Sequence, residues 1–235
     1  MEGLGHRRPR GGTLIPFNPL GVGLLYAVLS LDHFSFGPLL LSRPLVVGTA
    51  CGWALKQPAA GFEIGAVGEA LWALVPPAGP RQWDVGLMAA LATAWLAGDS
   101  APAGAPRWAL ALAGLIAFPL GLLGRRIDGW ARKQTRPFAA HALEGLSRGS
   151  DGPLRASLFA TALLWVFKSF LVFLVMESFG GALWDWIASR TPALFQTALE
   201  RTWVLWIALG AGALLWQFIG RWPARSLRPG PAAQP

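Results

Sequence analysis

The sequence has little of what soluble enzymes depend on. Only 14% of its residues are charged, whereas soluble domains carry about 25%. The one cysteine, Cys51, cannot form a disulfide within the chain, and the three scattered histidines, His6, His33 and His141, give no metal-ligand spacing with it. The motifs of serine hydrolases, zinc proteases and P-loop ATPases are also missing. We therefore expect no metal, no cofactor and no catalytic activity from the chain alone.

Apolar residues dominate what is present. They make up 54% of the 235 residues, and several apolar runs approach the about 20 residues that a helix needs to cross a bilayer. Residues 154–176 are the clearest candidate span. The pattern predicts an all-α polytopic membrane protein, built as a helical bundle.

The basic residues indicate how the chain is oriented. A net charge of +8 would suggest a nucleic-acid partner in a soluble protein. Here Lys and Arg cluster between the apolar runs, as the positive-inside rule predicts, so we expect no nucleic-acid binding.

The chain divides into a basic cytoplasmic tail (1–13), a single transmembrane domain (14–220) and a cytoplasmic Pro/Arg tail (221–235). Within the domain, residues 125–155 hold seven Lys and Arg against three acidic residues and are predicted to form a cytoplasmic loop.

One segment of the first half is expected to be broken. Gly and Pro punctuate residues 32–60, although the segment is otherwise apolar. If both tails and the loop lie inside, the first half crosses an even number of times, although it contains five apolar runs. Non-helical backbone at membrane depth survives only where protein shields it or where it lines a wet cavity. We therefore predict a re-entrant or broken segment near residues 32–60.

A carboxylate stands on a glycine-rich helical face that follows this segment. On a helix, Gly61, Gly65, Gly68 and Glu69 share one face, which favours close approach to a neighbouring helix. Glu63 lies about 200° around the helix from Gly61 and is close to its start. Carboxylates inside membrane segments are expensive and mark functional sites by default. Glu69 is therefore the leading candidate site residue.

Two interpretations of Glu69 remain open at this point. It binds hydroxyl groups of a polar solute, or it is a packing carboxylate, protonated or paired with Lys168 or Arg43. Arg43 either braces the broken segment or touches a substrate or a phosphate. Lys168 lies deep in the run 154–176 and is expected to face the bundle interior, where it braces the helices.

Two blocks of the chain carry a resemblance to a known family. Residues 42–74, SRPLVVGTACGWALKQPAAGFEIGAVGEALWAL, resemble the membrane subunit IIC of the mannose/fructose/sorbose family of bacterial phosphotransferase systems. That family shows Arg-Pro-Leu, an apolar run to Gly-Asp, and then Gly-Gly-x-Leu-Glu in an apolar helix. The residues at matching spacing here are Arg43, Pro44, Leu45, Gly61, Gly65 and Glu69. Residues 117–145 look like the family's Pro-Leu-x-x-x-Gly segment and the basic loop after it.

The resemblance implies a sugar-translocating subunit of the bacterial inner membrane. Its partners would be the sugar, a IID-type membrane subunit, a cytoplasmic IIAB phosphoryl-carrier protein and membrane lipid, and we expect a homo-oligomer. Glu69 would hydrogen-bond the sugar, with Gly65, Gly68 and Arg43 completing the candidate site. This chain has Lys56-Gln57 where the family has Gly-Asp. Two alternatives therefore stay open: a transport-inactive scaffold or sensor subunit, and an unrelated small-solute permease.

Overall fold

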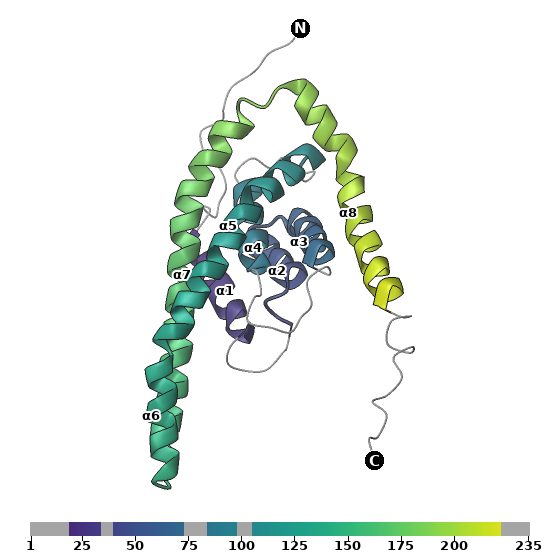
Figure 1. Cartoon of the computed structure of the whole chain (residues 1–235). Helices are drawn as coiled ribbons and strands as arrows, with labels where there is room; N and C mark the ends of the chain where they lie inside the picture. Colours follow the sequence, from purple (N-terminus) through teal and green to yellow (C-terminus); the bar gives the residue numbers. More distant parts are fainter. Residues whose placement is uncertain (1–18, 34–39, 73–83, 98–104, 222–235) are drawn as a thin grey trace, which may run out of the picture.

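The computed structural model describes residues 19–33, 40–72, 84–97 and 105–221, and within these ranges all regular structure is helical (Figure 1). This confirms the predicted all-α class. The predicted tails lie outside the described residues, apart from Arg221. The elements are α1 (Pro19–Leu29), the 3-10 helix η1 (Ser30–His33), α2 (Pro44–Ala54), α3 (Pro58–Trp72), α4 (Val85–Ala97), α5 (Arg107–Gln134), α6 (Arg136–Ser147), α7 (Gly152–Ala188) and α8 (Ala193–Arg221).

The predicted break is present as two short helices, α2 and α3. Each begins at a proline, Pro44 and Pro58, where the missing N–H costs little. The turn between them places Lys56 at φ 59° and closes with a hydrogen bond from the Gln57 N–H to the Gly52 carbonyl, 2.7 Å. With 11 and 15 residues, each helix is shorter than the about 20 residues of a full span.

The central element of the body is α4. Its residues from Val85 to Leu96 are all buried. A helix that is apolar all round belongs in a core, and α4 packs against α2, α3, α5 and α7. Its 13 residues are too few for a full span. Figure 1 shows α2, α3 and α4 in the middle of the molecule, with α7 and the α5–α6 segment along one side and α8 along the other.

Residues 125–155, which we expected to form a loop, are mainly helical. The helix α5 continues to Gln134, α6 follows after Thr135, and α7 begins at Gly152. Thr135 separates α5 from α6, and residues 148–151 form a turn with Gly149 at φ 73°. The segment is helical although it contains Gly129, Pro137 and Gly145, because Pro137 stands in the first turn of α6, where its missing N–H costs little, and many of the other residues are good helix formers. The cytoplasmic position of the segment stays a prediction.

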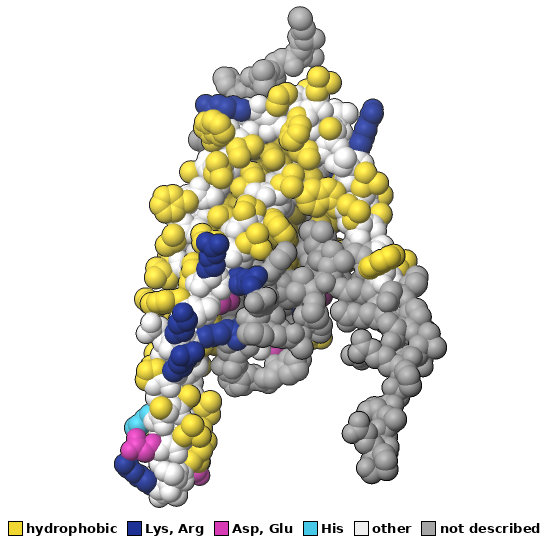
Figure 2. Space-filling view, viewed as in Figure 1, with side chains coloured by type: hydrophobic (Ala, Val, Ile, Leu, Met, Phe, Trp, Pro, Cys, Tyr) yellow, Lys and Arg dark blue, Asp and Glu magenta, His cyan; other side chains and the backbone are white. Residues whose placement is uncertain are grey.

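Two long helical segments lie along one side of the molecule. Within the described residues, Arg107–Ser147 and Gly152–Ala188 are long and apolar enough to cross a membrane. The predicted span 154–176 forms part of α7, which continues through Gly180 and Gly181 to Ala188. Figure 2 shows hydrophobic side chains over much of the visible face, whereas Lys and Arg gather along the lower part of the α5–α6 segment. Further Lys and Arg side chains lie at the upper end of the molecule, and hydrophobic side chains also lie beside the basic group.

Candidate functional site

The glycines of α3 let it lie directly on α2. A Cβ atom at Gly65 would stand 2.6 Å from the Pro44 carbonyl oxygen, and a Cβ atom at Gly68 would stand 2.8 Å from Pro44 Cβ. Real Cβ atoms do not approach so closely, so glycine is required at both positions. The glycine-rich face of α3 therefore lies directly against α2, and these glycines serve close packing of the two helices. The packing brings Glu69 to the start of α2.

Glu69 forms an ion pair with Arg43. Arg43 Nη1 donates to Glu69 Oε1 at 3.1 Å, and the two side chains are 27% and 34% exposed. The second oxygen, Oε2, is buried and has no hydrogen-bond partner among the described residues. A carboxylate oxygen can accept two hydrogen bonds. The pair therefore offers a buried acceptor beside a guanidinium that still has N–H groups to donate.

Arg43 is held in place by the chain around it. It precedes α2 with extended backbone angles, φ −64° and ψ 142°. The preceding residue, Ser42, is buried, and its N–H lies 3.4 Å from Asp32 Oδ2 of η1. The Ser42 carbonyl packs against Gly86, where a Cβ atom would stand 2.7 Å away. The start of α2 is therefore fixed between η1 and α4, and this fixes where the Arg43 side chain begins.

Lys168 does not reach Glu69. Its Nζ donates a hydrogen bond to Asp128 Oδ1, which links α7 to α5, and it lies 4.4 Å from the centre of the Trp165 ring. Both side chains of the pair are 11% exposed. Lys168 thus faces the bundle interior, and of the two cations considered as partners of Glu69, the structure pairs Arg43 with it.

Sequence reasoning missed a second buried polar group, formed by Tyr26 and Asp84. The Tyr26 hydroxyl donates to Asp84 Oδ2, and Asp84 Oδ1 accepts from the Leu87 N–H at 2.9 Å. Asp84 therefore caps the N-terminus of α4, and the bond to Tyr26 ties that end to α1. Two signals were available in the sequence: a lone Asp directly before an apolar run, and the only tyrosine of the chain.

The chemistry of the site is that of binding. No cluster of three or more His, Cys, Asp or Glu that could hold a metal ion occurs in the described part of the chain. A carboxylate and a guanidinium, side by side and half-buried, complement a ligand that both donates and accepts hydrogen bonds. Neutral polyhydroxy compounds have this property.

Comparisons with known proteins agree with the fold and with the motif blocks. A family model described as "PTS system sorbose-specific iic component" matches residues 18–221. A solved structure titled "Structure of membrane protein" superposes with a TM-score of 0.59 over 86% of this chain and 77% of the other, at 18% sequence identity. That likeness shows a shared fold. No curated protein sequence gives a significant match.

Proposed function

We propose that this chain, which belongs to the family of phosphotransferase-system (PTS) sorbose-specific IIC components, is a sugar-translocating membrane subunit that binds its sugar at Glu69. Membership makes it a membrane component of a sugar phosphotransferase system. Translocation of the sugar and the position of its binding site are the proposal.

One observation supports the position of the site above others. Glu69 Oε2 is buried and has no hydrogen-bond partner among the described residues, while Oε1 is held by Arg43 at 3.1 Å. A buried acceptor left unpaired costs about 1–3 kcal/mol, and a sugar hydroxyl that donates to Oε2 would remove this cost. Arg43 orients the carboxylate, and its remaining N–H groups can donate to sugar oxygens.

The proposal includes the partners with which such a sugar-translocating subunit would work. Phosphorylation of the sugar would be carried out by a cytoplasmic IIAB-type protein, and a IID-type membrane subunit would complete the translocation path. The chain would work as a multi-pass protein of the bacterial inner membrane, in a homo-oligomeric assembly. Gly65 and Gly68 serve the site through packing, since α2 occupies the space in front of them.

The substitution Glu69→Gln tests the position of the site. It keeps the size of the side chain and removes the negative charge of the carboxylate, to which Arg43 donates a hydrogen bond and to which the sugar hydroxyls would donate. Hydrogen bonds to charged groups contribute about 1.5–3 kcal/mol, so we expect sugar affinity to fall about tenfold or more. Isothermal titration calorimetry of the purified complex measures it, and thermal unfolding shows whether the variant is still folded.

Glu63→Gln is the matched control, because Glu63 lies on the same helix and is also partly exposed. It should bind sugar as the unmodified protein does. Unchanged affinity in Glu69→Gln would remove Glu69 from the site. Sugar uptake by the chain reconstituted with its IID-type and IIAB-type partners separates a transporter from a transport-inactive scaffold, which would bind sugar without moving it.

A further inference from the structure

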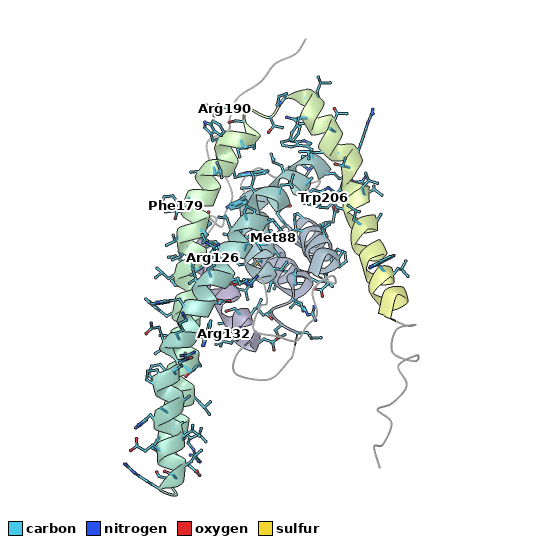
Figure 3. All side chains as sticks on the ribbon, viewed as in Figure 1. Met88, Arg126, Arg132, Phe179, Arg190 and Trp206 are labelled. Atoms are coloured by element: carbon cyan, nitrogen blue, oxygen red, sulfur yellow. The ribbon has the colours of Figure 1, made fainter. Side chains whose placement is uncertain are left out.

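An apolar cavity lies between α8 and the body of the molecule, apart from the Glu69 pair. Its volume is about 200 Å³, and it is open on one side. Nine apolar or glycine residues from four helices line it: Ile64, Val67, Met88, Leu110, Gly114, Leu115, Phe118, Trp203 and Trp206. Figure 3 labels two of them, Met88 on α4 and Trp206 on α8, on the facing sides of the space.

The lining indicates what kind of molecule fits this cavity. A stable buried water needs two to four polar partners, and this lining consists of aliphatic and aromatic groups. The cavity lies beside the part of α5 that is apolar enough to cross a membrane. A hydrocarbon chain from the surrounding bilayer can fill such a cavity, since a hydrocarbon chain needs no hydrogen-bond partner.

A cation lies close to one end of the cavity. The Trp108 N–H, at the start of α5, donates to Glu200 Oε2 of α8 at 3.3 Å, so these two helices meet there. Arg107 precedes Trp108 and is exposed. The lining residues Leu110 and Gly114 follow Arg107 by three and seven positions and therefore share its face of α5. An apolar cavity with a cation at its end is complementary to an anionic lipid.

We propose that this cavity binds one acyl chain of an anionic phospholipid, whose phosphate is held by Arg107. The lipid would fill the space between α8 and the helices α3, α4 and α5. It would thereby fix α8, which packs mainly on α3 and α5. The proposal is independent of the sugar site, because it makes no use of Glu69 or Arg43.

A glycine in the lining allows the cavity to be blocked. A Cβ atom at Gly114 meets nothing within 4 Å, so Gly114→Leu should fill the cavity and leave the helices in place. Gly129 on the same helix is also open and is exposed, which makes Gly129→Leu the matched control. Native mass spectrometry of the full chain in detergent with added dioleoyl phosphatidylglycerol measures lipid binding. We expect Gly114→Leu to lose the bound lipid and Gly129→Leu to keep it.

The role of Arg107 is tested by lipid preference. Unmodified protein should retain phosphatidylglycerol better than phosphatidylcholine with the same chains. Arg107→Gln should reduce binding of phosphatidylglycerol about fivefold, the factor equivalent to about 1 kcal/mol per cation near an anionic lipid surface. Arg201→Gln is the matched control, because Arg201 is also exposed but lies about 200° around α8 from the lining residue Trp203, so phosphatidylglycerol binding by this variant should change little. Phosphatidylcholine binding should change little in both variants.

A fluorescence measurement keeps the proposal testable if Gly114→Leu fails to fold. Phosphatidylglycerol with brominated acyl chains, added in detergent at about one equivalent, should quench tryptophan emission. Trp206→Phe should remove part of this quenching, and Trp216→Phe, which changes an exposed tryptophan of the same helix, should not. Equal lipid retention by Gly114→Leu and Gly129→Leu, or equal quenching in the two tryptophan variants, would overturn the acyl site. Equal retention of the two lipids by unmodified protein, or equal retention of phosphatidylglycerol by Arg107→Gln and Arg201→Gln, would overturn the role of Arg107.

Discussion

Lys56 has a backbone conformation that suits glycine better than lysine. Its φ is 59°, in the left-handed region, and it occupies the turn between α2 and α3. A residue with a Cβ atom pays about 1–2 kcal/mol there, whereas glycine adopts the conformation freely. The family pattern that this chain resembles has Gly-Asp where Lys56-Gln57 stands. The turn between α2 and α3 forms in this chain with Lys56 in place of glycine, and the Gln57 N–H donates to the Gly52 carbonyl.

Lys56→Gly should therefore stabilise the protein slightly. The variant relieves the left-handed strain of about 1–2 kcal/mol and loses about 0.5–1 kcal/mol to the greater freedom of glycine in the unfolded chain. We expect a net gain below about 1 kcal/mol, visible as a higher midpoint of thermal unfolding in detergent. Lys56→Ala keeps the Cβ atom and should show no such gain. A Gly variant less stable than the Ala variant would contradict the strain argument.

At the scale of elements, the close packing of α2 on α3 positions the candidate site. Neither helix is long enough to span a bilayer, so each depends on the other and on α4 for burial. Gly48 and Gly61 meet at their backbones: a Cβ atom at Gly48 would stand 2.5 Å from the Gly61 carbonyl oxygen. Because Arg43 directly precedes α2 and Glu69 lies on α3, the distance between the two helices sets the 3.1 Å ion pair.

Gly61→Ala should force the two helices apart. Overpacking of this kind costs about 1–3 kcal/mol, and the shift should also weaken sugar binding through the Arg43–Glu69 pair. Gly129→Ala is the control on an open helix surface, where alanine should stabilise the helix by up to about 1 kcal/mol. Thermal unfolding and calorimetry of both variants check this. If Gly61→Ala bound sugar and unfolded like the unmodified protein, the close contact would have no structural role.

At the scale of the whole molecule, the long helices suggest how the chain is placed across the membrane. With 37 residues, α7 is about 55 Å long, which exceeds the about 30 Å hydrocarbon core of a bilayer. The Lys and Arg of the segment 125–155 lie on α5, on α6, in the turn after α6 and in the first turn of α7. The positive-inside rule predicts that this end of the molecule faces the cytoplasm.

Cysteine labelling in intact cells tests this orientation. The only native cysteine, Cys51, is buried, so the unmodified protein should give little background with a membrane-impermeant maleimide. Ser147→Cys, at the end of α6, should be labelled only after the cells are opened. Ser189→Cys, at the opposite end of α7, should be labelled from outside. Both residues are exposed, and the reverse pattern would show that residues 125–155 face outward.

The sequence alone determined the features that depend on local composition and periodicity. Low charge and long apolar runs specified an all-α membrane protein. Gly and Pro specified the break between α2 and α3, because these residues act on the backbone at their own positions. The helical repeat placed Glu69 on the glycine face, next to Gly65 and Gly68, since residues three and four apart share a face.

Only the tertiary structure decided which charged and polar groups meet. Glu69 pairs with Arg43, 26 residues away, Lys168 with Asp128, 40 away, and Tyr26 with Asp84, 58 away. Each pair joins elements whose relative position is set by the way the helices cross, and helical periodicity carries no information on that crossing. For the same reason the cavity beneath α8 exists only in the folded molecule: its lining comes from four helices, and no single one of them contains the pattern.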